Sequence, residues 1–349
     1  MTKKRWAIAA GAAVIILCIC VYFNREALAL KGFDLFLADS LEKKLENTYK
    51  PVDRNVPVPV PVSSEEKEKP FSVLLLGVDQ RGNEIGRSDS IIYTVVRPAD
   101  GRLLMVSIPR DFYVELVGRD KQDKINHAFA YGGAGMTMDT VEKLLGAPVH
   151  YYTSINFQGF RDAIDAIGGI ALPITEDIIN NEPGHEYFFI KGGQDYYNGV
   201  DALNFVRYRE DAGGDVSRTE RHGQFLNALM DKATSLKQWS KIPDLIEIMG
   251  NNFSMDMRPE QLIDLAQSML QAKQRIVYSH TLKGKGGRLV SGGAWYYFAD
   301  EEDLAQTSLM IESWLDADTP VNQLIVPDSY NQGKVDESDK LLSSAERTE

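Results

Sequence analysis

The amino-acid sequence predicts an α/β fold in which a central mixed β-sheet is flanked by helices on both faces. Continuous apolar runs of six to eight residues, typical of buried strands, alternate with segments whose apolar residues recur at helical spacing. One long N-terminal apolar segment precedes this region and predicts a single transmembrane helix. The chain has 349 residues, of which 44% are hydrophobic and 25% charged, a composition typical of a globular protein.

The N-terminal segment is expected to hold the protein in the cell membrane. Residues 6–23 are 18 uncharged, mostly apolar residues, and a helix of that length spans about 27 Å, enough to cross a hydrocarbon core. Residues 1–5 carry three basic side chains, so the positive-inside rule places the N-terminus in the cytoplasm and the rest of the chain outside. A cleavable signal peptide is the alternative, because Ala-Leu-Ala at 27–29 matches a cleavage site.

Residues 24–69 are predicted to form a stalk and a linker. Between residues 33 and 49 apolar side chains recur at helical spacing, which predicts a short amphipathic helix. Residues 56–62 alternate Val and Pro, which excludes a central paired strand and favours an extended polyproline II spacer. The folded extracytoplasmic domain is expected over residues 70–316, followed by a polar, disordered tail over 317–349.

Strands and helices are expected in alternation along this domain. The first strand is a continuous apolar run that ends at Gly77 and Asp79, and the second and third are joined by the turn Pro-Ala-Asp-Gly at 98–101. The expected strands are residues 71–78, 91–96, 103–108, 149–155, 170–174 and 276–282. The expected helices are residues 137–145, 157–167, 199–205, 219–235, 242–249 and 259–272. Such a mixture is typical of a sheet covered by helices on both faces.

Charge and cysteine content exclude several classes of function. Lys and Arg total 38 and Asp and Glu total 50, a formal net charge of −12, which argues against general electrostatic binding to nucleic acid. Cys18 and Cys20 both lie in the apolar N-terminal segment, so the rest of the chain has no disulfide, thiolate zinc site or cysteine nucleophile. The sequence also lacks a Gly-x-Ser-x-Gly elbow, a Walker loop and a His-Glu-x-x-His motif.

The remaining candidates for chemistry are aspartates and arginines near the ends of the predicted strands. Asp79 follows the first strand, Arg87 and Asp89 precede the second, and Arg110 and Asp111 follow the third. Ligands of open α/β sheets bind where loops leave the strand ends. Surface ion pairs are the alternative interpretation of any one of these residues, but the group as a whole favours a binding site.

More arginines lie later in the chain. Arg218 and Arg221 are three residues apart and share a helical face. Arg207 and Arg209 are two apart, so both reach one ligand only if the chain leaves the helix after Phe205 and becomes extended. Several arginines in an acidic chain favour a phosphate site, because the guanidinium binds phosphate through two hydrogen bonds. Carboxylates beside them fit a divalent cation that bridges to phosphate.

Short motifs in a characteristic order resemble the LytR–CpsA–Psr family. They are Leu-Gly-Val-Asp at 76–79, Gly-Arg-Ser-Asp-Ser at 86–90, Ser-Ile-Pro-Arg-Asp at 107–111, Asp-Lys-Ile-Asn-His-Ala at 123–128, Tyr-Gly-Gly at 131–133, Ile-Gly-Gly-Ile at 167–170, Arg-Tyr-Arg at 207–209 and Gly-Asp-Val-Ser-Arg-Thr-Glu-Arg at 214–221. The resemblance is strong over residues 70–235 and extends weakly to about 315.

The resemblance implies an enzyme of the Gram-positive cell envelope. Such an enzyme transfers a glycopolymer, for example wall teichoic acid, from a polyprenyl pyrophosphate carrier to peptidoglycan, forming a phosphodiester and releasing polyprenyl phosphate. By the matching motifs, Asp79 and Asp89 would hold Mg²⁺ or Mn²⁺. The pyrophosphate would be bound by Arg87, Arg110, Lys124, Arg207, Arg209, Arg218 and Arg221. Arg87, Arg110 and Asp111 would be catalytic.

Several points stay open at this level. The family commonly has Gln where this chain has His222, so the role of position 222 is undetermined. The general base could be Asp79, Asp89 or Asp111. The family fold also implies an apolar pocket for the polyprenyl tail, although apolar positions such as Leu226, Leu229 and Met230 are typical of ordinary core. A pyrophosphate hydrolase, a non-enzymatic regulator and a glycan-binding scaffold remain alternatives.

Overall fold

The computed structural model describes residues 46–52, 54, 69–79, 86–181, 186–208, 215–233, 252–271, 276–328 and 330. The expected transmembrane segment 6–23, the Val-Pro segment 56–62 and the expected helix 242–249 lie outside these ranges, as does most of the expected stalk helix, of which the short 3-10 helix η1 (Glu46–Thr48) is described. Within the described part of the chain, no helix is both long and apolar enough to cross a membrane.

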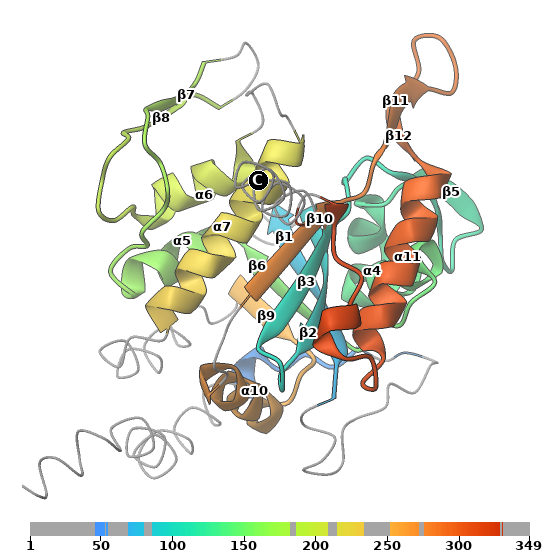
Figure 1. Cartoon of the computed structure of the whole chain (residues 1–349). Helices are drawn as coiled ribbons and strands as arrows, with labels where there is room; N and C mark the ends of the chain where they lie inside the picture. Colours follow the sequence, from blue (N-terminus) through green and yellow to red (C-terminus); the bar gives the residue numbers. More distant parts are fainter. Residues whose placement is uncertain are drawn as a thin grey trace, which may run out of the picture.

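A six-stranded mixed sheet forms the centre of the molecule (Figure 1). Its strands lie in the order β10-β3-β2-β1-β6-β9. Their bounds are β1 Phe71–Asp79, β2 Arg87–Arg97, β3 Arg102–Ser107, β6 Tyr151–Asn156, β9 Phe253–Met255 and β10 Ile276–Thr281. Strand β1 runs parallel to β6 and antiparallel to β2, and β3 runs parallel to β10. The predicted mixed sheet is confirmed.

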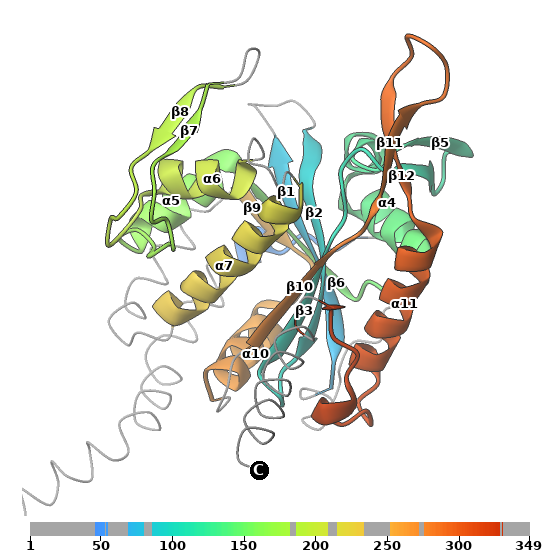
Figure 2. The same cartoon turned by 45° about the horizontal axis from the view of Figure 1, so that its top comes forward.

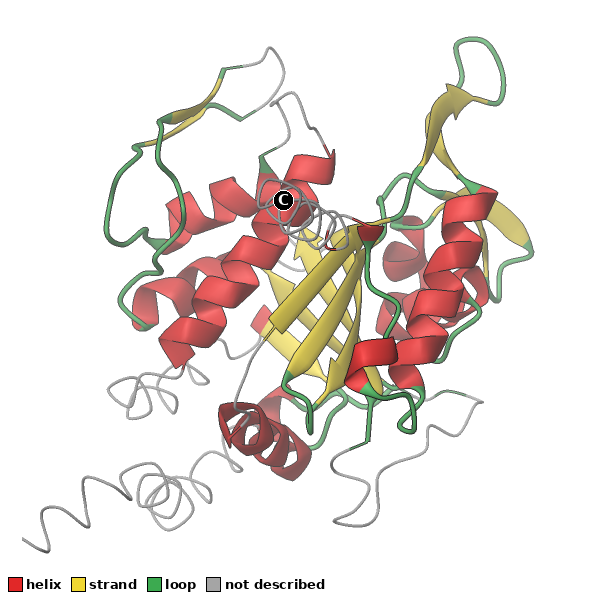
Figure 3. Ribbon diagram, viewed as in Figure 1, coloured by secondary structure: helices red, strands yellow, loops and turns green. Residues whose placement is uncertain are grey.

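Helices cover both faces of this sheet (Figures 2 and 3). Helices α4 (His127–Leu145) and α11 (Glu301–Leu315) lie against one face. The opposite face is covered by α5 (Phe157–Ala166), α6 (Gly199–Arg207), α7 (Asp215–Ala233) and α10 (Pro259–Gln271). The predicted three-layer arrangement is therefore present, and five of the six expected strands and five of the six expected helices have counterparts.

Strand β1 shows why its sequence is a continuous apolar run. Leu74 and Leu76 point into the core cluster that includes Met138 of α4 and Trp314 of α11. Val73, which precedes Leu74 and points to the opposite face, packs with residues of α10. A strand buried on both faces needs apolar residues at every position. The same run ends at Asp79, where β1 leaves the core.

Two expected elements differ from the structure. Helix α4 begins at His127, ten residues before the expected helix over 137–145. Gly132 and Gly133 disfavour a helix in the sequence, and in the structure they interrupt the helical backbone and divide α4 into two segments. Gly133 has φ 62° and ψ −151°, a conformation open to glycine. The expected strand over 170–174 is wrong: Ile170 forms one isolated bridge with Tyr197. Its alternate apolar residues are buried, but Pro173 lacks the N–H that a strand ladder requires.

Three hairpins were not expected from the sequence. They are β4 (Tyr113–Leu116) with β5 (Lys121–Lys124), β7 (Ile178–Asn180) with β8 (Phe188–Ile190), and β11 (Gly284–Arg288) with β12 (Trp295–Ala299). Each strand has three to five residues, too few for a clear apolar alternation. The β7–β8 and β11–β12 hairpins project from the same end of the molecule (Figure 1).

The folded body extends beyond the expected limits of 70 and 316. Before it, the Arg54 guanidinium forms an ion pair with Asp139 of α4 at 2.8 Å and donates to the carbonyl of Val149 at 2.9 Å. After residue 316, the carbonyl of Thr319 accepts a hydrogen bond from Arg97 at 3.0 Å, and Leu324 is buried in the core. Residues 331–349 of the expected tail lie outside the described ranges.

Candidate active site

Two cavities meet at one end of the sheet. The first, of about 760 Å³, is polar. Its lining includes Asp79, Arg87, Asp89, Arg110, Asp111, Lys124 and Asn126. The second, of about 660 Å³, is largely apolar and lies between the sheet and helices α5, α6 and α7. Asp89 and Arg110 line both cavities, so the two form one continuous site with a charged end and an apolar end.

A β-bulge places Asp89 at this junction. Along the β1–β2 ladder Gly77 faces Ser90 and Val78 faces Ser88, which leaves Asp89 as an extra residue in β2. A bulge re-aims the side chains beside it, and here both Asp89 and Ser90 line the apolar cavity. Beyond the bulge Asp79 faces Arg87 across the ladder, so the polar cavity receives side chains from the adjoining ends of both strands.

The loop after β3 contributes alternating charges. Arg110 Nη1 donates to Asp89 Oδ1 at 2.7 Å, and Arg110 Nε lies 3.7 Å from Asp111 Oδ2. Lys124 Nζ, at the end of β5, donates to Asp111 Oδ1 at 2.6 Å. Burial alone would lower the pKa of Arg110, but the nearby carboxylates of Asp89 and Asp111 raise it above its ordinary value. These four charges form a chain of ion pairs along the cavity.

Polar atoms of this cavity that are buried without a hydrogen-bond partner among the described residues include Asn126 Oδ1 and Arg110 Nε, which lies 3.7 Å from Asp111 Oδ2. Asn126 is only 4% exposed. Buried polar atoms in native proteins are nearly always paired, so such atoms in a charged cavity indicate a place where a ligand binds. Asn126 was not singled out from the sequence, although it lies within the motif at 123–128.

The donor set fits a cation that takes part of its coordination from a substrate. Asp79 and Asp89 supply carboxylates to the cavity, and Asn126 Oδ1 is a further oxygen. Among the described residues no group of three or more His, Cys, Asp or Glu is arranged to hold a metal ion. Mg²⁺ is typically held by one or two carboxylates together with phosphate oxygens and water, which matches this sparse set.

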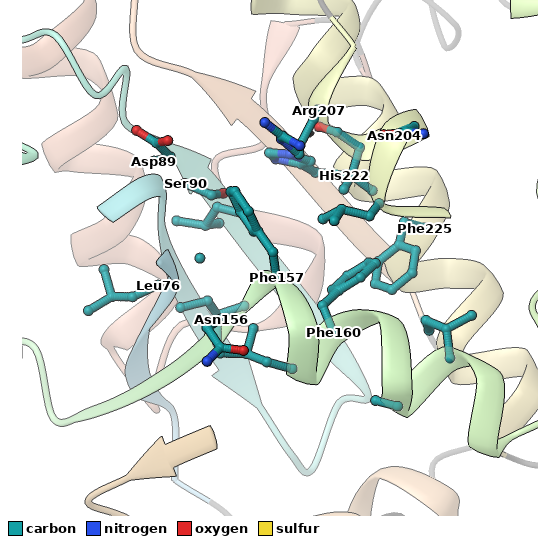
Figure 4. A pocket seen from close by; sticks show the side chains of 18 of the residues that line it. Leu76, Asp89, Ser90, Asn156, Phe157, Phe160, Asn204, Arg207, His222 and Phe225 are labelled. Atoms are coloured by element: carbon teal, nitrogen blue, oxygen red, sulfur yellow. Dashed lines mark hydrogen bonds between the residues drawn. The ribbon is translucent and has the colours of Figure 1, made fainter. Parts of the chain in front are cut away.

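Aromatic side chains enclose the apolar cavity. Phe157 and Phe160 project from α5 and Phe225 from α7 (Figure 4), and the rings of Phe160 and Phe225 are 5.0 Å apart. Leu226 and Leu229, which periodicity alone assigns to the core, line this cavity. The side chain of Met230 lies outside the described part.

Arg207 lies at the boundary between the apolar cavity and its polar end (Figure 4). Its guanidinium is 4.5 Å from the centre of the Phe157 ring, and its Nη1 is 3.5 Å from Glu186 Oε2. Arg207 is the last residue of α6, and Tyr208 is the first extended residue, with φ −64° and ψ 138°. The chain therefore leaves the helix two residues later than the expected departure after Phe205.

The remaining expected arginines have different positions. Arg209 lies outside the described residues, and the backbone of Arg218 belongs to α7 while its side chain is outside them. Arg221 lines neither cavity. Its Nη1 donates to the carbonyl of Tyr208 at 2.8 Å, and burial lowers its pKa. Arg221 thus supports the segment that follows Arg207.

His222 lines the apolar cavity beside Arg207 (Figure 4). Its Nε2 donates to the carbonyl of Val206 at 3.0 Å, which ties helix α7 to the last turn of α6. The ring is buried and part of the cavity wall.

The joined cavities suit an amphipathic ligand with an anionic head and an apolar tail. Arg87, Arg110, Lys124 and Arg207 provide positive charge at one end. The walls at the other end offer aliphatic and aromatic surface. Burial of hydrocarbon there is favoured by the hydrophobic effect, and the arginines match the geometry of phosphate oxygens.

Comparisons with known proteins agree with this chemistry. Residues 35–311 match the LytR_cpsA_psr family. The polyisoprenyl-teichoic acid–peptidoglycan teichoic acid transferase TagU of Bacillus licheniformis is 38% identical over 251 residues, 72% of this chain and 79% of that protein. TagU of Bacillus subtilis is 32% identical over 303 residues, 86% of this chain and 96% of that protein. Its crystal structure has a TM-score of 0.55 at 33% identity and covers 74% of this chain and 100% of the crystallised one.

A further solved structure contains a ligand. The structure described as TagT bound to LI-WTA has a TM-score of 0.60 at 27% identity and covers 76% of this chain and 99% of that one. The match over residues 35–311 spans most of the chain, and the TagU relatives are alike over most of their length. The chain belongs to the LytR–CpsA–Psr family.

Proposed function

We propose that this protein transfers a phosphate-linked glycopolymer, wall teichoic acid or a related secondary wall polymer, from a polyprenyl pyrophosphate carrier to peptidoglycan. The observation that carries this proposal is the junction of the charged and apolar cavities at Asp89 and Arg110. A polyprenyl pyrophosphate has the two matching parts, a long hydrocarbon chain and an anionic head. The TagU relatives are named for this transfer, and the TagT structure is described with a bound ligand named LI-WTA.

Asp79 and Asp89 would hold Mg²⁺ or Mn²⁺ in this proposal, with Asn126 Oδ1 nearby. The ion, when bound, neutralises negative charge on the pyrophosphate. Arg87, Arg110 and Lys124 bind the head group from the polar cavity. Arg207 binds the head group from the boundary of the apolar cavity. Arg209 and Arg218 are assigned to the same head group because they belong to the family motifs.

The reaction moves one phosphoryl-linked polymer between two oxygens. A hydroxyl oxygen of the acceptor sugar attacks the phosphorus that carries the polymer, the bond to the bridging oxygen breaks, and polyprenyl phosphate leaves. Arg110 and Lys124 stabilise charge on the reacting phosphate, which is the main protein contribution to phosphoryl transfer. Since Asp79 and Asp89 are assigned to the metal, Asp111 is the carboxylate that takes the proton from the acceptor hydroxyl.

The proposal includes placement at the cell membrane. The apolar residues 6–23 would form one spanning helix with the N-terminus in the cytoplasm, and the domain that carries the site would lie outside. A membrane-bound carrier lipid would then meet the domain on that side of the membrane.

Transfer by the full-length protein in detergent tests the proposal. The assay supplies a polyprenyl pyrophosphate-linked polymer and peptidoglycan, and measures polymer attached to peptidoglycan. We expect transfer that requires Mg²⁺, is abolished by EDTA, and falls at least a hundredfold in Asp89→Asn, while the surface control Asp162→Asn on α5 stays active. Release of polyprenyl phosphate at the same rate with or without peptidoglycan, and no attached polymer, would identify a hydrolase instead.

A further inference from the structure

The β11–β12 hairpin carries an aromatic surface that the proposed chemistry has not used. It forms a two-stranded sheet of its own and projects beyond the body at the end of the molecule where the polar cavity lies (Figures 1 and 2). Strand β12 has the sequence Trp-Tyr-Tyr-Phe-Ala, and its partner β11 has the sequence Gly-Lys-Gly-Gly-Arg. One strand is thus mostly aromatic and the other is mostly glycine.

The glycines let one aromatic ring lie directly on the backbone. Gly286 faces Tyr297 across the ladder, and a Cβ at Gly286 would overlap the indole of Trp295. The indole therefore packs against bare backbone on one side, and Trp295 remains 43% exposed. This is a flat, supported aromatic surface open to solvent, held in place by the strand beneath it.

A row of stacked rings connects this surface to the body. The Trp295 and Tyr297 rings are 6.1 Å apart at an angle of 28°, and Tyr297 and the buried Phe112 are 5.3 Å apart at 23°. Such offset-stacked rings stabilise each other and fix their common orientation. Trp295 is therefore positioned by the core rather than by a mobile loop.

The hairpin is also joined to a residue of the polar cavity. The backbone N–H of Tyr297 donates to the carbonyl of Asp111 at 2.9 Å. On the other face of β12, the Tyr296 ring centre lies 5.9 Å from Lys124 Nζ, which itself binds Asp111. Trp295 is two residues from Tyr297, about 7 Å along an extended strand. The aromatic surface thus begins next to the proposed proton acceptor and leads away from it.

The hairpin is positively charged within an acidic protein. Residues 283–299 contain Lys283, Lys285 and Arg288 and no Asp or Glu, whereas the whole chain has a net charge of −12. Lys285 and Arg288 lie on β11 and are exposed; Arg288 pairs with Trp295 and shares its face, whereas Lys285 pairs with Phe298 on the other face. Aromatic faces pack against the C–H faces of sugar rings, and exposed lysine and arginine attract carboxylates. An acidic glycan matches both features.

We propose that the β11–β12 hairpin binds the acceptor glycan strand, with sugar rings on Trp295 and carboxylates of the strand near Arg288, which pairs with Trp295 across the ladder. The inference rests on the proposed transfer, because it assigns the hairpin to the acceptor of that reaction. A strand bound here would run past Tyr297 toward Asp111, where its hydroxyl would meet the reacting phosphate. Trp295 acts as a binding and positioning residue.

Binding and transfer are measured separately to test this assignment. Full-length protein in detergent is mixed with peptidoglycan freed of teichoic acid, without donor, and the bound fraction is determined. We expect Trp295→Ala to weaken binding about tenfold, equivalent to about 1.4 kcal/mol. Trp295→Phe should restore most of the affinity, because it returns an aromatic face. Leu289→Ala, at an exposed aliphatic position of the same hairpin, is the matched control and should bind as wild type does.

The kinetic arm uses the transfer assay. Trp295→Ala should raise the KM for peptidoglycan about tenfold and leave kcat and the affinity for the pyrophosphate donor unchanged. Arg288→Glu, at the exposed position that faces Trp295 across the ladder, should weaken binding several-fold, and the difference should shrink at high salt. The thermal midpoint of each variant should match that of wild type.

The outcomes separate this inference from the proposed function. Wild-type glycan binding and acceptor KM in both Trp295→Ala and Arg288→Glu would overturn the inference, even if transfer itself is normal. Equal loss in Leu289→Ala and Trp295→Ala, together with binding of wild type to vesicles of anionic lipid, would assign the hairpin to the membrane surface instead. Trp295-dependent glycan binding by a protein that performs no transfer would support the glycan site and refute the transferase.

Discussion

Replacing Arg110 by lysine tests whether the junction of the two cavities is the catalytic centre. Arg110 Nη1 binds Asp89 at 2.7 Å, while its buried Nε lies 3.7 Å from Asp111 Oδ2 and makes no hydrogen bond to a described residue. The guanidinium can thus hold Asp89 and a phosphate oxygen at once. Lysine keeps the charge but presents a single ammonium group, so it can serve one of these partners at a time.

The magnitude follows from the bond that lysine loses. A hydrogen bond between charged groups contributes about 1.5–3 kcal/mol. Since the Arg110 side chain is 35% exposed, we expect the lower part of this range, about 1.5–2 kcal/mol, or roughly ten- to thirtyfold in the rate of transfer.

The assay is transfer by the full-length protein together with binding of a polyprenyl pyrophosphate analogue. Arg161→Lys on α5 is the matched control, because Arg161 binds only the neighbouring Gln158 among the described contacts and lines neither cavity. Its rate should stay within twofold of wild type. If Arg110→Lys also keeps the wild-type rate and analogue affinity, the reacting phosphate does not lie at this junction.

Two further predictions concern stability. Arg54→Ala should cost about 2 kcal/mol and lower the thermal midpoint, because it removes charged hydrogen bonds to Asp139 and Val149 that tie the preceding chain to the body; an unchanged midpoint would show that this contact contributes nothing. Burial raises the pKa of Asp256 to about 6. Between about pH 4 and pH 6 the folded protein therefore retains a proton that the unfolded chain releases, so the free energy of unfolding falls as the pH rises through this window. Asp256→Asn keeps an acceptor for the Tyr152 N–H and should be more stable than wild type by about 1–3 kcal/mol at pH 7. In thermal unfolding the stabilities of the two proteins should converge near pH 4. Parallel pH profiles of stability would contradict the raised pKa.

The sheet and its covering helices could be predicted because their signal is local. Burial on both faces requires apolar residues at every position of β1, and this is visible as the run at 71–78. The segment at 170–174 is also apolar but forms only one isolated bridge among the described residues, since apolar alternation indicates burial and not the presence of a neighbouring strand. Periodicity therefore assigns elements well when partner strands are available.

Part of the site was also visible in the sequence. Asp79, Asp89, Arg110 and Asp111 stand out because they are charged residues that flank apolar runs at strand ends. Their family motifs add Lys124 and the later arginines. The motif order identified the relationship to known transferases without any knowledge of distances.

Only the tertiary structure decided how these residues meet. Asp89 points to the junction because it is the extra residue of a bulge in β2. The bulge depends on the register between β2 and β1, which no short segment encodes. Arg207 approaches the same cavity from α6, nearly a hundred residues after Arg110. Helical spacing places Leu226 and Leu229 on an apolar face, but whether that face is filled by other side chains or lines a cavity depends on the packing of α5, α6 and α7 against the sheet. Periodicity determines which side of an element avoids water, while the distance between layers determines whether a ligand can enter.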